Sequence, residues 1–319
     1  MSQRVNVISS PFNNAWQLVR LTSPDGSCQC DVHLHGAHIT SYKAQLNTSR
    51  EDEAFFVSKK SLFAEDKAIR GGVPICFPQF SDKGSFVMSH GFARNVEWEL
   101  IDKSSDDEKS TVAILRMIKS SSYKGTHKDI LSGLQQWDSV NVDLNVRLYN
   151  HQLETKLCVS NGGTDTKVFT FAFHNYFRIG NIRNIKVDGI HNNHHAVQYV
   201  DKVKKGETST VDNSNPIEIS QEVDRVYLSL LDPIESIIVE PERSREIHIS
   251  QHAHSAQNVV VWNPWEDKCK AMTDMLPNEY EQFVCVETGQ IQESIQLQKG
   301  QVFEAVQVIS LKQDTSSKL

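Results

Sequence analysis

Apolar and polar residues alternate along much of this chain, which is the pattern of half-buried β-strands. The clearest run, 140–148, has Val or Leu at every second position, with Asn, Asp or Arg between them. A period of two turns one set of side chains toward a core and the other toward water. The alternation resumes over 153–159 after the pair Asn150 and His151. We therefore predict an antiparallel hairpin that turns at this pair.

Shorter strand patterns follow through the rest of the chain, and amphipathic helical patterns are nearly absent. Many strands without crossover helices predict an all-β antiparallel sandwich or barrel. No linker rich in Pro, Gly or Ser divides the chain, so we expect one domain over 1–319, with 312–319 a polar tail. The other expected strands are 96–101, 111–118, 168–174, 258–262, 283–287 and 302–310, with polar spacers at 101–110 and 202–216 and a solvated loop or edge strand at 240–248.

Composition and charge narrow the class of protein. Of 319 residues, 39% are hydrophobic and 23% charged, which is the balance of a folded protein and excludes a disordered chain. An excess of 40 Asp and Glu over 33 Lys and Arg argues against a nucleic-acid-binding protein. No run approaches the roughly 20 apolar residues of a membrane span. The first 20 residues lack a signal-peptide core, so we expect synthesis in the cytosol.

Cysteine usage agrees with a reducing compartment. The six cysteines are scattered and form no C-x-x-C motif, so we expect all of them to be structural thiols.

Four segments place polar residues where a sandwich core would not select them. Glycines beside the first arginine would let the backbone approach a ligand closely. A His and a Glu at strand ends could supply a general acid and a general base. Each residue also has an ordinary structural alternative, such as a core histidine, an edge glutamate or a strand-bridging arginine. The candidates are Arg70, Gln79, His90 and Arg94 in 68–98, His174 in 169–179, Asp224 in 224–228, and Glu287 after 283–286.

Sequence blocks around these residues resemble the glucose-6-phosphate 1-epimerase (hexose-6-phosphate mutarotase) family of the aldose-1-epimerase superfamily. The resemblance implies a galactose-mutarotase-like antiparallel β-sandwich, or supersandwich. It also implies that His174 and Glu287 are the catalytic pair. The residues that it places in contact with substrate are Arg70, Gln79, Arg94 and Asp224. His90 matches the histidine that precedes GFAR and is a further candidate for binding substrate. The blocks are IRGGVPICFPQF, SHGFARNVEWEL, FAFHNYFRI, DRVYL, VVVWNPW and YEQFVCVE, which occur in this order between residues 69 and 287.

The resemblance predicts interconversion of the α and β anomers of glucose 6-phosphate and related hexose 6-phosphates. Glu287 would take the proton of the C1 hydroxyl while His174 protonates the ring oxygen, with no metal or organic cofactor. Arg70 and Arg94 are the candidates for the phosphate, since guanidinium matches phosphate oxygens. A free-aldose mutarotase and a non-catalytic sugar-binding protein remain the alternatives.

Two further groups of residues need an interpretation. The histidine clusters 33–38, 191–195 and 252–254 could hold a metal, because positions 33 and 35 would share a strand face. We expect solvated loop histidines instead. Trp262 and Trp265 could stack on a sugar, although buried support of the sandwich is the expected role.

The chain ends in Ser317, Lys318 and Leu319, the tripeptide that peroxisomal import receptors read. We therefore expect a location in a peroxisome-like organelle such as a glycosome, with that receptor as a partner. Separately, we expect a monomer. A cytoplasmic location is the alternative.

Overall fold

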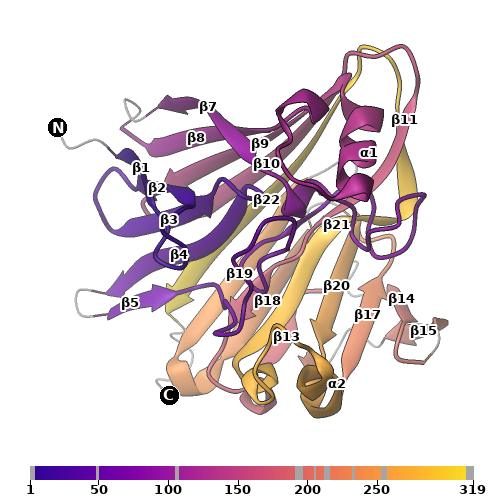
Figure 1. Ribbon diagram of the computed structural model, residues 1–319. Coiled ribbons are helices and arrows are strands. Elements are labelled where there is room, and N and C mark those ends of the chain that lie inside the picture. Colours follow the sequence, from indigo (N-terminus) through magenta and orange to yellow (C-terminus); the bar gives the residue numbers. More distant parts are fainter. Residues whose placement is uncertain are drawn as a thin grey trace.

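The computed structural model describes residues 4–47, 50–104, 108–190, 197–204, 206–211, 216–231, 234–252 and 257–313. Within these residues the strands form three antiparallel sheets of nine, eight and five strands (Figure 1). The predicted all-β antiparallel architecture is confirmed.

The nine-stranded sheet is the common layer on which the other two pack. The five-stranded sheet contacts it through β1 to β4, and the eight-stranded sheet through β21. In sheet order, the nine strands are β16 (Ile217–Glu218), β13 (Lys186–Asp188), β18 (Ile234–Glu240), β19 (Arg245–His252), β22 (Val302–Gln313), β10 (Leu153–Asn161), β9 (Val140–Tyr149), β8 (Ser110–Met117) and β7 (Trp98–Ser104).

The eight-stranded sheet carries the candidate residues Asp224 and Glu287, and His174 directly follows one of its strands. Its order is β15 (Glu207–Val211), β14 (Val197–Asp201), β17 (Val223–Tyr227), β20 (Asn258–Asn263), β21 (Phe283–Leu297), β11 (Lys167–Phe173) and β6 (Ile75–Cys76), with β12 (Tyr176–Arg178) also paired to β21. The five-stranded sheet runs β1 (Val5–Ser9), β2 (Gln17–Thr22), β3 (Cys28–His33), β4 (His38–Asn47) and β5 (Arg50–Glu53).

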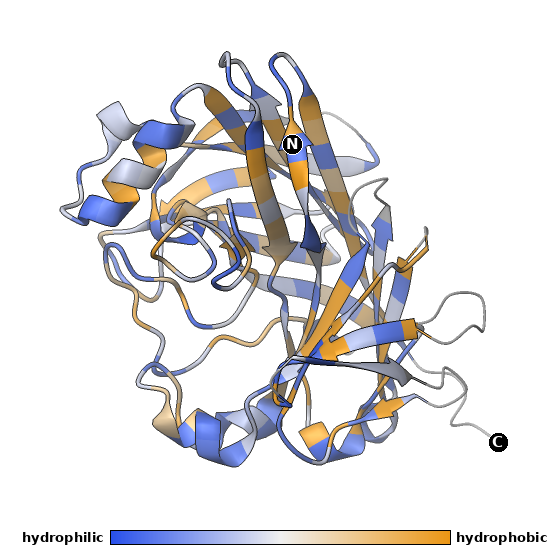
Figure 2. Cartoon of the chain, turned by 90° about the vertical axis from the view of Figure 1, so that its right-hand side faces the viewer, coloured by the Kyte–Doolittle hydropathy of each residue, from blue (hydrophilic) through white to orange (hydrophobic). Residues whose placement is uncertain are grey.

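The alternating pattern produces the sheets as predicted. Along β9 every apolar residue is buried and every polar residue between is half-buried. β9 pairs with β10 in the register Leu148 to Leu153, which confirms the hairpin. Figure 2 shows the result as hydrophobic and hydrophilic bands that follow one another along the strands.

Short helical segments interrupt the strands. The α-helix α1 (Lys128–Trp137) was not predicted; it buries Ile130, Leu134 and Trp137, which lie four and three residues apart. The second, α2 (Trp265–Ala271), has two turns. The 3-10 turns are η1 (Ala93–Asn95), η2 (Ser120–Ser122), η3 (Ile182–Asn184), η4 (Pro241–Arg243) and η5 (Glu279–Gln282). No helix in the described ranges is long and apolar enough to span a membrane.

Two charged or polar segments differ from expectation. Segment 240–248 is solvated only at the turn η4 (Pro241–Arg243), because β18 and β19 on either side lie inside the nine-stranded sheet, and Glu240 and Arg245 are 2% and 0% exposed. The spacer 202–216 contains the strand β15. Distant partners compensate the buried charges of the first segment, the Gly180 N–H for Glu240 and the Arg178 carbonyl for Arg245, whereas β15 stays largely exposed and pairs with the neighbouring strand β14.

The first histidine cluster is buried instead of solvated. His33 and His38 are fully buried, and burial lowers the pKa of His33 to about 4 and that of His38 to about 3. The His38 ring bonds to the carbonyl of Gly71 at 2.7 Å. Residues 191–195, 253–254 and the tripeptide 317–319 lie outside the described residues.

Candidate active site

The fold brings His174 and Glu287 together in the eight-stranded sheet. His174 directly follows β11, Glu287 lies within β21, and these strands pair in the register Phe173 to Thr288. The His174 backbone N–H donates to the Pro74 carbonyl at 3.0 Å, which fixes the residue at the strand end. His174 Nδ1 lies 3.3 Å from Glu287 Oε1, and both side chains are more than nine-tenths buried. Two titratable groups therefore meet in a site shielded from bulk water.

Aromatic side chains hold the His174 ring in place. Tyr176 stacks on it with ring centroids 4.7 Å apart and planes 8° from parallel, and Trp262 meets it edge-on at 5.9 Å. Trp262 is only partly buried and lies against the candidate catalytic ring. Trp265 instead packs beneath the guanidinium of Arg183, 4.8 Å from the ring centroid.

Burial shifts the pKa of both members of the pair against their charged forms. Desolvation raises the pKa of Glu287 well above its usual value, and the nearby Asp224 carboxylate adds to the increase. Desolvation lowers the pKa of His174 well below its usual value, with help from the charges of Arg94 and Arg70. The site therefore favours a neutral imidazole beside a carboxylic acid more strongly than ordinary pKa values would predict.

The two candidate arginines have different surroundings. Arg70 Nε donates to Asp274 at 3.0 Å and Nη1 donates to the Tyr176 hydroxyl at 2.9 Å, so its charge is compensated. Arg94 donates from Nη2 to the Ser89 carbonyl, and its Nε is buried without a hydrogen-bond partner. Among the described residues no carboxylate forms an ion pair with Arg94, and burial lowers its pKa. Arg94 thus presents a positive charge that no carboxylate of the described residues contacts directly, although the charge of Glu287 acts on it from farther away.

Gln79 is engaged in holding the loop 80–89. Its Nε2 donates to the carbonyls of Phe86 and Met88, and its Oε1 accepts from the Phe86 N–H at 2.9 Å. The side chain is 1% exposed. Because both amide hydrogens are used within the loop, the geometry gives Gln79 a positioning role for this segment.

His90 directly follows the loop 80–89, and its ring lies 5.4 Å from the ring of His174. Its Nδ1 accepts the Ser81 backbone N–H at 3.2 Å and lies 3.1 Å from the Cys76 sulfur. Burial, followed by the charge of Arg94, lowers the pKa of His90 well below its usual value. A neutral ring whose Nδ1 accepts a hydrogen bond carries its proton on Nε2, so His90 can donate to a ligand from that atom.

Asp224 has a cationic neighbour that the sequence did not reveal. Lys202, in the turn after β14, places its ammonium 3.9 Å from Asp224 and 5.4 Å from the centre of the Phe80 ring. Burial raises the pKa of Asp224, and Lys202 opposes that increase. Lys202 stands in a run of lysines within a polar spacer, so no local signal separated it from solvent-exposed lysines.

The glycines beside Arg70 serve packing, which corrects the expected reason for them. Gly71 and Gly72 both have positive φ, and a Cβ at these positions would lie 2.3 Å from the Phe56 carbonyl oxygen and 2.2 Å from that of Ile39. The missing side chains therefore let this segment press against neighbouring backbone, which holds Arg70 in place.

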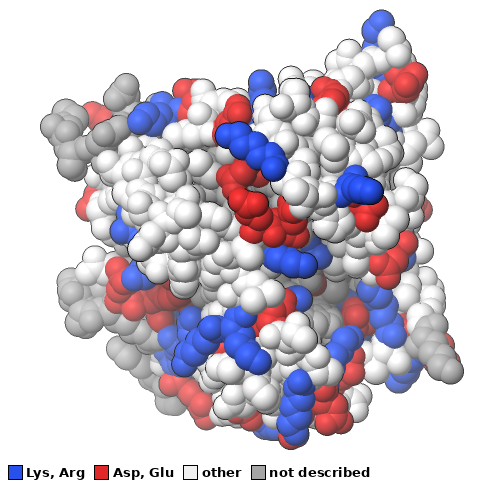
Figure 3. Space-filling model, viewed as in Figure 1, with Lys and Arg blue, Asp and Glu red and all other residues white. Residues whose placement is uncertain are grey.

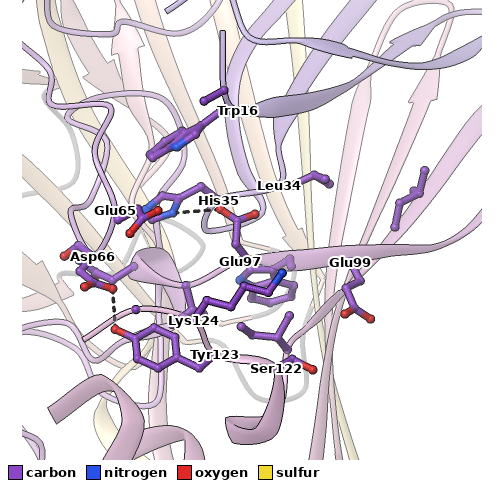
Figure 4. A pocket seen from close by; sticks show the side chains of 17 residues that line it. Trp16, Leu34, His35, Glu65, Asp66, Glu97, Glu99, Ser122, Tyr123 and Lys124 are labelled. Carbon is purple, nitrogen blue, oxygen red and sulfur yellow. Dashed lines mark hydrogen bonds and ion pairs between the residues drawn. The ribbon is translucent and has the colours of Figure 1, made fainter. Parts of the chain in front are cut away.

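A separate cavity of about 700 Å³ is lined by residues of the segments 15–16, 34–35, 65–66, 95–100 and 118–125. Trp16 stacks on His35 there, with ring centroids 4.4 Å apart (Figure 4). Its lining includes Glu65, Asp66, Glu97 and Glu99 but neither His174 nor Glu287. This cavity is therefore separate from the pair formed by His174 and Glu287. Figure 3 shows acidic and basic side chains interspersed over the face seen in Figure 1, with an acidic group near its middle.

Known proteins are similar to this chain in sequence. A relative from Cenchrus ciliaris, provisionally named glucose-6-phosphate 1-epimerase, is 30% identical over 291 residues, which cover 86% of this chain and 79% of the relative. A protein of the same provisional name from Escherichia coli K12 is 30% identical over 273 residues, 83% of this chain and 81% of the relative.

Solved structures agree with these relatives. The provisionally named mutarotase YeaD of Salmonella typhimurium superimposes with a TM-score of 0.78 at 25% identity over 97% of each chain. A galactose mutarotase-like protein from Clostridium acetobutylicum matches in fold, with a TM-score of 0.70 at 14% identity over 97% of this chain and 98% of its own. The expected galactose-mutarotase-like sandwich is thereby confirmed.

The family comparison covers the sheets and the buried pair together. The model of the aldose 1-epimerase family matches residues 17–310, a span that includes His174, Glu287 and every other candidate site residue. With its antiparallel sandwich and its buried acid–base pair, this chain belongs to the aldose 1-epimerase family.

Proposed function

We propose that this protein interconverts the α and β anomers of glucose 6-phosphate and related hexose 6-phosphates. The observation that carries the proposal is the separation of 3.3 Å between His174 Nδ1 and Glu287 Oε1. The C1 hydroxyl oxygen and the ring oxygen of a cyclic sugar are bonded to the same carbon. A proton acceptor for one and a proton donor for the other must therefore lie side by side, as these two groups do.

The reaction needs two proton transfers in each direction. Glu287 as carboxylate takes the proton of the C1 hydroxyl, and His174 as imidazolium gives a proton to the ring oxygen. The bond between C1 and the ring oxygen breaks and leaves an open-chain aldehyde. Rotation about the C1–C2 bond presents the other carbonyl face, and the reverse transfers close the ring to the other anomer. Both groups return to their starting states.

The shifted pKa values determine which protonation state starts the cycle. Proton transfer turns imidazolium and carboxylate into imidazole and carboxylic acid, which is the neutral arrangement that burial favours. The imidazolium and carboxylate from which ring opening begins are therefore the less populated arrangement of the free site, and transfer of the Glu287 proton to His174 produces them.

The groups around the pair supply contacts for the rest of the substrate. Arg94, which lacks a carboxylate partner among the described residues, and Lys202 are the proposed contacts for the phosphate. Asp224 can accept hydrogen bonds from sugar hydroxyls, and the Nε2 of His90 can donate a hydrogen bond to one. Arg70 is a further proposed substrate contact. It also donates a hydrogen bond to the hydroxyl of Tyr176, the residue whose ring stacks on His174. The charge of Arg94, which no carboxylate of the described residues contacts directly, favours a phosphorylated sugar over the alternative, a free aldose.

The test is a mutarotation assay of the purified protein. Freshly dissolved α-glucose 6-phosphate is coupled to a dehydrogenase specific for the β anomer, and free glucose and galactose are followed in parallel by polarimetry. We expect the protein to accelerate conversion of the phosphorylated sugar more than that of either free sugar. Faster conversion of the free sugars would identify a free-aldose mutarotase, and no acceleration of any sugar would leave only sugar binding.

Replacing Arg94 with Ala should raise KM for glucose 6-phosphate by about 10–100-fold, because a charge-assisted hydrogen bond to phosphate is lost. KM for free glucose should change much less. Arg116→Ala is the matched control, since that arginine pairs with Asp143 on the nine-stranded sheet. An equal loss for both sugars in Arg94→Ala would refute the phosphate role.

A further inference from the structure

A third ligand-type side chain lies beside the proposed catalytic pair and has no part in the mechanism. Cys285 stands two residues before Glu287 on β21, so strand geometry directs both side chains to the same face. One ligand atom each of His174, Cys285 and Glu287 lies within 4.8 Å of the others. All three residues are buried, and Cys285 is 0% exposed.

The polar atoms of this cluster are incompletely satisfied by the protein. His174 Nδ1 and Glu287 Oε2 are buried and have no hydrogen-bond partner. A buried polar atom without a partner carries a desolvation cost, which a bound ligand can remove. Two such atoms on members of one cluster indicate that the cluster can accept a further group without losing existing hydrogen bonds.

The chemistry of the donors identifies that group. A thiolate, an imidazole nitrogen and a carboxylate oxygen are the ligands of Zn²⁺, and three protein ligands leave the fourth position open to water. Ligands at zinc–ligand distances of about 2.0–2.3 Å lie about 3–4 Å apart in a tetrahedral site. The observed spacing therefore requires only a small contraction, and a rotamer adjustment can supply it.

We propose that His174, Cys285 and Glu287 form a binding site for Zn²⁺ or a similar thiophilic divalent ion, and that the bound ion excludes the sugar. On binding, the Cys285 thiol releases its proton to solvent as the sulfur–metal bond forms, His174 binds through a neutral ring nitrogen, and Glu287 binds as carboxylate. The inhibitory part rests on the proposed function, because the ion would occupy the atoms that transfer protons.

Burial keeps the site silent in the absence of metal. Desolvation raises the pKa of the Cys285 thiol well above its usual value, and the charge of Glu287 raises it further. Metal binding to Cys285 requires loss of the thiol proton, and removal of the ion lets the thiol take a proton up again. Inhibition should accordingly be reversed by a chelator.

Cobalt supplies a direct test of the site. Co²⁺ is titrated into the intact protein, and absorption is recorded for the thiolate-to-cobalt charge-transfer band in the near ultraviolet and the visible bands of tetrahedral cobalt. We expect both kinds of band in the unaltered protein, and added Zn²⁺ should abolish them by displacing the bound Co²⁺. Cys76→Ser is the matched control, because Cys76 is also buried and lies 3.1 Å from His90. It should keep the bands, whereas Cys285→Ser should lose the charge-transfer band.

Metal affinity gives a second readout that does not depend on activity. Zn²⁺ should raise the Tm of the unaltered protein and of Cys76→Ser. The affinity for Zn²⁺ should fall by at least about 10–100-fold in Cys285→Ser, because even the loss of a residue that only hydrogen-bonds to a metal ligand weakens binding by that factor. If Cys285→Ser does not fold, Cys285→Ala replaces it. Unchanged affinity without Cys285, or a charge-transfer band lost only with Cys76, would overturn the site.

The mutarotation assay then tests inhibition. Zn²⁺ should inhibit competitively with glucose 6-phosphate, and EDTA should restore the rate. The two proposals fail separately: cobalt bands without mutarotation would refute the proposed function alone, and mutarotation without cobalt bands or Zn²⁺ inhibition would refute the metal site alone.

Discussion

Replacing Glu287 with Gln should lower kcat by about 10²–10⁴-fold, the usual contribution of a general base. The amide has the shape of the carboxyl group but cannot accept the C1 hydroxyl proton. Glu287 is 1% exposed and its Oε2 has no hydrogen-bond partner, so the substitution should leave the fold intact. The coupled assay with α-glucose 6-phosphate measures the loss. His174→Ala should fall in the same range, because it removes the proton donor.

The control for this pair is Glu304→Gln on β22. Glu304 is largely exposed and pairs with Lys156 at 2.9 Å, so its replacement should leave kcat near normal. Turnover within a few-fold of normal in Glu287→Gln would show that the proton leaves the C1 hydroxyl by another route. Circular dichroism of both variants confirms that folded proteins are being compared.

Replacing Arg245 with Met should cost about 3–5 kcal/mol of unfolding free energy, the usual result of breaking a buried ion pair from one side. Arg245 is 0% exposed; it donates to the Glu240 carboxylate and to the backbone carbonyl of Arg178, and its Nη1 lies 3.6 Å from Asp52. Met fills similar volume but removes the closest cation from the buried Glu240 carboxylate, which is left with Arg243 at 4.0 Å. Urea denaturation followed by fluorescence measures the change.

Arg116→Met provides the comparison for a more exposed pair. Arg116 and Asp143 make a short ion pair on β8 and β9, with side chains 38% and 18% exposed. Solvent screening limits such pairs to about 0–1 kcal/mol. A similar cost for both substitutions would mean that Arg245 contributes through general packing instead of through its buried charge.

The strands were predictable from the sequence because their signal is local. The period-two runs at 140–148 and 153–159 became β9 and β10, and each of the other predicted strands exists with shifted ends. The helix α1 was not predicted because only a few of its apolar residues, Ile130, Leu134 and Trp137, form its buried face. These are too few positions to establish a helical period.

Charged and histidine-rich segments were misjudged for the opposite reason. Glu240, Arg245, His33 and His38 look solvent-exposed in any local window, yet all are buried. Their partners come from distant segments: the Gly180 N–H for Glu240, the Arg178 carbonyl for Arg245, and the Gly71 carbonyl for His38. Burial of a polar group depends on such partners, and the partners are set by tertiary packing.

The sequence by itself determined the alternation that builds the sheets, and its motifs singled out His174, Glu287 and the arginines as candidates. Only the tertiary structure decided that His174 and Glu287 meet 3.3 Å apart, that Arg94 lacks a carboxylate partner among the described residues, and that Lys202 and Cys285 join the site. The reason is physical: an alternating pattern acts between neighbours along one strand, whereas distances, desolvation and charge compensation depend on which strands lie side by side.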